Sequence, residues 1–359
     1  MQLDKEKLLS FPDVLRESRK DDKNKVDIYC KMGELTFLTR DIKEYDADEE
    51  EEDGKKVKTS LHAQISVPHG GQRVRLGFSM NSFRQFIQSQ LGIPAKYLMK
   101  CPAGLAKDQV DYWKATMADR DLLIRARIGG ELKEPYARAV LGATYGKLDN
   151  TPLLGMVKEV AEEANMMVWR YDMPDTSMHV KAILGDNVNM GTKDEPDPVH
   201  FGFHMGTSET GNRMTTLDIM TFRLVCTNGM ITLVNGHRLI QQQHRGDLDI
   251  GNFRQEIRTK MNEAILKQDA VFGKMRGLKD SKTLDVFEEA RAMWSKFQLP
   301  ATHRNMLFNL LTDKYKDGTR WDIVNAATEV AQSLENPDIR MKIEEGAGKY
   351  MLLEAPILG

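Results

Sequence analysis

Short stretches of alternating apolar and polar residues run through the first two thirds of the chain. A period of two is typical of strands that bury one face, and the residues from Val26 to Met32 show it clearly. The same pattern predicts a partner strand for this one at 35–39, beyond Gly33. It predicts further strands at 122–128, 136–145, 199–205 and 214–226, and two between 166 and 184 around Pro174. Asn228-Gly229 indicates a hairpin after the last of them.

From residue 252 onward the apolar residues recur every three to four positions, which is typical of amphipathic helices. The pattern predicts helices at 252–272, 283–297, 301–315, 321–334 and 338–352, and earlier ones at 4–19, 79–91, 105–117 and 150–164. This order predicts an α+β fold with a central mixed or antiparallel sheet, flanking helices and a helical C-terminal region. We divide the chain into N-terminal strands with an acidic mobile loop (1–60), a central α+β core (61–250) and the helical region (251–359).

Composition agrees with a globular protein that works in the cytoplasm. Of the 359 residues, 41% are hydrophobic and 29% are charged, which is enough apolar material for a core. Three widely spaced cysteines (Cys30, Cys101, Cys226) indicate reduced thiols. The charged N-terminus predicts no signal peptide, and no run approaches the 18 or so apolar residues of a membrane span. The 21 methionines favour an adaptable contact surface, so we expect a homo-oligomer.

Charge is distributed unevenly, although the formal total is only −2. Residues 61–160 carry 14 basic and 8 acidic side chains, and residues 221–282 carry 11 and 6. The segment between them, 161–220, carries 4 and 10. The total excludes a uniformly basic protein, but a confined basic surface is allowed because fields are local and screened.

An almost unbroken acidic run, DADEEEED, occupies residues 46–53. Like charges repel, so the simplest interpretation is a solvated loop. The alternatives are a nucleic-acid mimic or a regulatory flap that competes for the protein's own basic groove.

Several strings in this chain resemble, in order, one family of phage- and plasmid-encoded proteins, called phage/plasmid-like proteins, which has no assigned function. The strings are LGIPAKYLMKCPAGLA (91–106), Tyr112-Trp113, LLIRARI (122–128), YARAVLGATYGKLDNTPLL (136–154), RLVCTNGM (223–230) and GTRWDIVNAATEVAQ (318–332). The resemblance extends from about residue 75 to the end. It implies a setting in phage genomes and mobile elements, hence the host cytoplasm, but no activity. The family often has Ser-Asp where this chain has Gly142-Ala143.

The motifs of common catalytic sites are incomplete in this chain. A phosphate-binding loop needs four residues between its glycines and then Lys followed by Ser or Thr. Only three residues separate Gly142 from Gly146, which precedes Lys147. Gly206 and Gly211 are separated by four residues but are followed by Asn-Arg. His200 and His204 alternate as in a strand, where they would lie about 13 Å apart, too far to share one metal ion. We therefore expect no enzyme, cofactor, metal or bound nucleotide.

The strongest remaining signal is a set of basic residues on predicted strands. Alternation places Arg125 and Arg127 on one face of strand 122–128, and Arg138, Tyr145 and Lys147 accompany the next strand. Such a face can follow a phosphodiester backbone and stack a base. Arg238 and Arg245 of the second basic segment are further candidates. Equally, these arginines could pair with the acidic neighbours in 161–220 or simply keep a sheet face soluble.

Together these features favour a phage protein that binds single-stranded DNA, as an oligomeric, ATP-independent annealing protein for recombination. This prediction rests partly on analogy with strand-annealing proteins of phages, which use no nucleotide. The alternative is a non-enzymatic protein-interaction factor for counter-defence or host takeover, with residues 46–53 as its contact. An enzyme whose site is assembled from distant residues is a third alternative.

Overall fold

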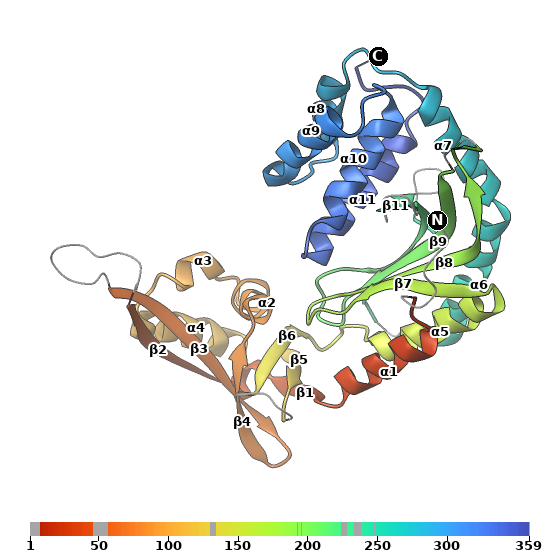
Figure 1. Ribbon diagram of the computed structural model, residues 1–359. Coiled ribbons are helices and arrows are strands. Elements are labelled where there is room, and N and C mark those ends of the chain that lie inside the picture. Colours follow the sequence, from red (N-terminus) through yellow and green to blue (C-terminus); the bar gives the residue numbers. More distant parts are fainter. Residues whose placement is uncertain are drawn as a thin grey trace.

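The computed structural model describes residues 8–45, 57–129, 134–191, 193–194, 196–223, 228–232, 238–246 and 249–358. The fold is α+β, as predicted, but the strands form two separate sheets (Figure 1). One is a mixed six-stranded sheet in the N-terminal part, and the other is an antiparallel sheet, also of six strands, that is followed by the C-terminal helices. The acidic run at 46–53 and Cys226 lie outside the described residues, whereas Cys30 and Cys101 are free and buried.

The N-terminal sheet has the strand order β1-β5-β6-β4-β3-β2. Its strands are β1 (Lys25–Lys31), β2 (Thr36–Tyr45), β3 (Val57–His69), β4 (Gln72–Phe78), β5 (Asp121–Arg127) and β6 (Tyr136–Gly142). The expected pairing of β1 with β2 is wrong, because η2 (Met32–Glu34) leads the chain to the opposite edge and β1 pairs with β5 instead. The boundary that we drew at residue 60 falls inside β3, so both sides of it share one sheet.

The helical segments between β4 and β5 cover one face of this sheet. They are α2 (Met80–Arg84), the π-helix η3 (Gln85–Gln90), α3 (Ala95–Leu98) and α4 (Ala103–Thr116). Phe86, Ile87 and Val110 pack against Phe37 and Ile124, and all five are buried. Because strand side chains alternate, the residues in between point to the opposite face, and the arginines of β5 are among them.

The second sheet has the order β11-β10-β9-β8-β7, with β12 also pairing with β10. Its strands are β7 (Met166–Asp172), β8 (Met178–Asn189), β9 (Pro198–Thr207), β10 (Thr215–Arg223), β11 (Asn228–Thr232) and β12 (Ile240–Gln242). The hairpin predicted near residue 228 exists, but Asn228 and Gly229 are paired strand residues of β11. One face, with Phe201 and Phe203 of β9, packs against α1 (Phe11–Asp22), α5 (Asn150–Glu163) and α6 (Ile250–Leu266).

The other face of the second sheet carries several buried polar residues beside a small apolar cluster, and it lies against the last helix, α11 (Pro337–Met351). The buried Lys181 Nζ pairs with Glu344 at 2.5 Å, and His179 Nε2 lies 3.0 Å from Asp338 Oδ1. The remaining helices are α7 (Gln268–Asp280), α8 (Val286–Lys296), η4 (Ala301–His303), α9 (Arg304–Asp313) and α10 (Arg320–Gln332). The helix predicted at 252–272 is thus divided at Lys267 into α6 and α7.

Methionine is mainly a core residue here. Among the residues whose burial the structure describes, twelve methionines are buried and three (Met80, Met99, Met306) are exposed. Most of these methionines therefore fill irregular space between sheets and helices. In the part of the chain that the structure describes, no helix is both long and apolar enough to cross a membrane.

Candidate nucleic-acid interface

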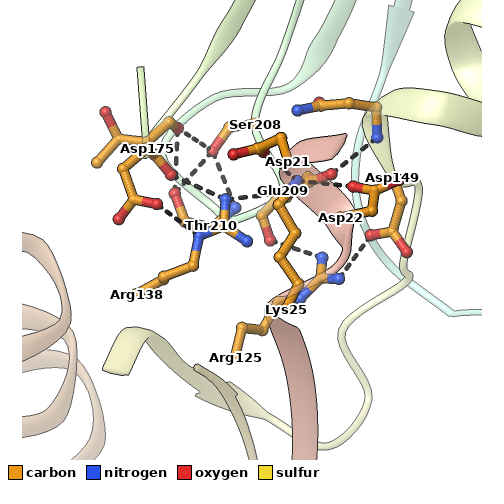
Figure 2. Close-up of polar contacts among 12 residues, drawn as sticks. Asp21, Asp22, Lys25, Arg125, Arg138, Asp149, Asp175, Ser208, Glu209 and Thr210 are labelled. Carbon is orange, nitrogen blue, oxygen red and sulfur yellow. Dashed lines mark hydrogen bonds and ion pairs between the residues drawn. The ribbon is translucent and has the colours of Figure 1, made fainter. Parts of the chain in front are cut away.

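The predicted arginines lie on one face of the N-terminal sheet, as the alternation required, but the second half of the molecule covers them. Loop 208–214, between β9 and β10, packs onto β5 and β6 (Figure 2). Gly211 has φ +78°, and a Cβ there would lie 2.9 Å from Leu141 Cδ2, so only glycine allows this close approach. The expected exposed arginine face is therefore corrected to a buried one.

Arg125 and Arg138 are each only 3% exposed. Arg125 donates to Asp27 at 2.9 Å and Asp149 at 2.6 Å, and its third nitrogen donates to the Glu209 carbonyl at 2.9 Å. Arg138 donates to Asp175 Oδ1 at 2.8 Å and to Glu209 Oε2 at 3.0 Å. Neither guanidinium is available to a phosphate backbone.

Glu209 lies at the centre of this network and is 2% exposed. It accepts from Arg138 and from the Asn150 backbone N–H at 2.9 Å, and it pairs with Lys25 Nζ at 2.8 Å. Burial favours its neutral form, but the positive charges of Lys25 and Arg138 outweigh burial and lower the pKa of Glu209 to about 2. Sequence reasoning missed this residue. The only signal was its place in the Gly206–Gly211 segment, which we had tested as a phosphate-binding loop.

Arg127 is half-buried and belongs to the same network. It donates to Asp21 at 2.5 Å and to Asp175 at 3.0 Å, so it joins β5 to α1 and to the β7–β8 turn. Two of the acidic partners, Asp175 and Glu209, come from segment 161–220, which is the pairing that we had kept as the alternative. These arginines therefore hold the two sheets together.

Tyr145, Lys147 and Arg245 come together at the edge of the network. Tyr145 and Arg245 form an isolated β-bridge, which brings the two basic segments side by side. Tyr145 donates to the Ser208 carbonyl at 3.0 Å and one face of its ring stacks on His244. Lys147 pairs with Asp27 at 3.2 Å and remains 40% exposed in its side chain. Arg245 is exposed.

Arg238 lies elsewhere, beneath α11. Its guanidinium donates to the buried Asp218 at 2.5 Å and to Glu345 at 2.7 Å. It therefore ties α11 to the second sheet, and it does not belong to a surface shared with Arg125 or Arg138.

A basic cleft that we did not predict lies between the second sheet and the C-terminal helices. It has a volume of about 950 Å³. It is formed by the residues just before β9, the end of β10, the end of α7 and the α9–α10 connection. Five cationic side chains line it: Arg223, Lys279, Lys282, Lys314 and Lys316. Three carboxylates, those of Asp197, Asp317 and Asp322, line it as well, so positive charge is in excess.

The inner part of the cleft is rigidly built. Asp197 is 5% exposed and accepts from Arg223 Nε at 2.6 Å. The ring of Trp321 lies 5.7 Å from the Arg223 guanidinium and 5.8 Å from Lys279 Nζ. Asp322 caps α10 by accepting from the Thr319 N–H at 3.0 Å. These contacts hold the inner side chains of the cleft in place. They also engage the positive charges of Arg223 and Lys279 with groups of the protein itself.

The rim of the cleft carries the available charge. Lys282 and Lys316 are exposed, and neither forms an ion pair with another residue in the described ranges. Two ammonium groups on the rim, with Lys279 deeper inside, can contact successive phosphates of a strand. The sequence held a partial signal for this site, since Lys279 and Lys282 belong to the basic segment 221–282 and Trp321 to the string GTRWDIVNAATEVAQ.

Comparisons of the chain with family models, with curated proteins and with solved structures gave no match. The similarity to phage/plasmid-like proteins thus stays a prediction, and the geometry of the site carries the functional argument.

Proposed function

We propose that this protein binds single-stranded nucleic acid, DNA in a phage setting, in the basic cleft between β10, α7 and α10. The observation that carries the proposal is the set of five cationic side chains around one cleft of about 950 Å³. Contacts to phosphates supply most of the affinity in sequence-independent binding. The aromatic residues there, Trp321 and Tyr315, are 7% and 8% exposed, so the cleft offers charge rather than a stacking platform. We therefore expect little sequence preference.

The wider role we propose is strand annealing without ATP during phage recombination, in the host cytoplasm, by a protein that self-associates. The cleft is compatible with such a role because binding a strand through phosphate contacts does not require ATP.

A fluorescence anisotropy titration tests the binding. The probe is a labelled single strand of about 20 nucleotides, which is longer than the roughly 4–16 nucleotides that one OB-fold domain binds. The titration is repeated at salt concentrations between about 50 and 200 mM. Three phosphate contacts would give a slope of log affinity against log salt of about −2, at about −0.7 per contact. Absence of binding at the lowest salt, or binding indifferent to salt, would exclude the proposal.

The variant Lys282→Glu/Lys316→Glu locates the site. Loss of two phosphate contacts should weaken binding at least about tenfold and reduce the salt slope by about 1.4. The matched control is Arg19→Glu/Lys23→Glu, which reverses two exposed charges on and just after α1. Equal weakening by both variants would show a general charge effect rather than a site in the cleft.

A protein-interaction factor is the second candidate, and one observation favours it. Helix α4 exposes Leu105, Tyr112 (64% exposed) and Trp113 (41%), and Tyr97 and Met99 are exposed just before it. Exposed apolar groups of this kind often mark contact sites between proteins. Light scattering distinguishes the candidates: a mass above 40.9 kDa that Tyr112→Ser/Trp113→Ser returns to the monomer, together with absent strand binding, would favour this one.

A further inference from the structure

The face of the N-terminal sheet that carries the buried arginines continues past β6 onto β4, β3 and β2. Strand register shows this directly, because one row of paired residues crosses the sheet: Arg127, Tyr136, Gly77, Gln64 and Leu38. The second half of the molecule covers the row at β5 and β6 only. The helical segments α2 to α4 pack against the opposite face.

The uncovered half of the face forms a groove of about 510 Å³. Its walls include Arg40 and His62, which lie directly opposite each other on β2 and β3, and Arg75 of β4. Residues opposite each other on antiparallel strands have Cβ atoms about 5 Å apart. Arg40 and His62 are therefore neighbours in the wall of the groove. Among the described residues that line the groove, Glu134 is the single carboxylate, and it accepts from Gln64 at 3.4 Å.

The polar groups of the groove are not satisfied from within the protein. Arg40 and Arg75 are exposed, and among the residues that the structure describes neither has an ion-pair partner. His62 Nε2 is buried and has no hydrogen-bond partner in the described structure. The two exposed guanidinium groups fit phosphate oxygens, since arginine offers paired donors that match the planar O–P–O edge.

This groove and the basic cleft lie in different parts of the molecule. The strands β2 and β3 project at one end of the molecule, whereas α7 and α10 lie beside the second sheet, away from them (Figure 1). Strand annealing requires a protein to hold one strand while it samples another, and two separate cationic surfaces meet that requirement.

We infer that the groove formed by Arg40, His62 and Arg75 is a second contact surface for the phosphate backbone, which receives a second strand while the cleft holds the first. This inference rests on the proposed function of the cleft. It makes the protein a two-site binder, in which the two sites have separable effects.

The experiment compares Arg40→Glu/Arg75→Glu with Lys282→Glu/Lys316→Glu in the full-length protein. Anisotropy measures binding of one labelled strand, and fluorescence energy transfer between two complementary labelled strands measures the rate of annealing. For the groove variant we expect first-strand binding within about twofold of the unaltered protein and annealing slowed at least about tenfold, given the affinity that two phosphate contacts supply. The cleft variant should lose both activities, and Arg19→Glu/Lys23→Glu should lose neither.

Each arm has a result that overturns the inference. Unchanged annealing by the groove variant shows that the groove takes no second strand, and loss of first-strand binding equal to that of the cleft variant shows that one strand occupies both surfaces. Failure of the unaltered protein to bind any strand removes the proposed function itself, and so is distinguishable from both. If the double glutamate variant does not fold by circular dichroism, Arg40→Gln/Arg75→Gln gives the same comparison with smaller changes in charge.

Discussion

Arg138 and Arg75 lie on the same face of one sheet, on the adjacent strands β6 and β4, yet their environments are opposite. Arg138 is 3% exposed and bonds to Asp175 and Glu209. Arg75 is exposed at the wall of a groove. Loop 208–214 covers strand β6 at Arg138 and leaves strand β4 uncovered at Arg75.

The difference shows that the role of an arginine on a strand is decided by what covers the face. A buried guanidinium is tolerated where carboxylates and carbonyls satisfy most of its donors. Arg125, Arg127 and Arg138 have such partners from α1, from the β7–β8 turn and from loop 208–214. An arginine without carboxylate or carbonyl partners remains exposed to solvent, where its guanidinium group can bind a ligand.

The largest effect on stability should come from Arg138→Ala. It leaves the buried Glu209 with one cationic partner fewer, and removing one member of a buried pair costs about 3–5 kcal/mol. Urea unfolding monitored by circular dichroism measures the free energy. Arg138→Lys keeps the charge and should recover part of the loss, and a loss below about 1 kcal/mol for the alanine variant would contradict the structural role.

The second largest effect should come from acid, which lowers the free energy of unfolding by protonating Glu209 at the covered strands β5 and β6. The folded-state pKa of Glu209, about 2, lies below its ordinary value of 4.5, so its contribution to stability is complete above pH 4.5 and is lost as the pH falls towards 2. That contribution is about 3 kcal/mol at neutral pH, at about 1.4 kcal/mol per unit of pKa. The difference in unfolding free energy between the unaltered protein and Glu209→Gln should therefore shrink between pH 5 and pH 3, and a constant difference would refute this account.

The smallest effect on stability should come from substitutions on the uncovered part of the same face, on strands β2 and β4. Arg75→Ala and Arg40→Ala remove exposed side chains, so the free energy of unfolding should change by less than about 0.5 kcal/mol. The same urea titration measures it, with Arg138→Ala as the contrasting variant. A loss of several kcal/mol would mean that the open half is also structural, and the comparison would fail.

Local patterns predicted much of the fold. Strands β5 and β6 and helix α5 lie where alternation and helical spacing placed them, because periodicity reports which side chains of one element face the core. The pairing of β1 was not predictable in this way. Its partner β5 begins 90 residues after the end of β1, and periodicity holds no information about which strands meet.

The candidate site shows the same division. Alternation determined that Arg125 and Arg127 share a face, and the charge of each segment showed where basic side chains gather. Only the tertiary structure decided that Asp21, Asp149 and Glu209 meet those arginines, and that Lys279, Lys282 and Lys316 surround one cleft. The physical reason is that ion pairing acts over a few ångströms in space, whereas its partners here are separated by up to 106 positions in the chain. The sequence alone determined the elements and their polar faces, and the packing of the two sheets decided which charges are buried and which face water.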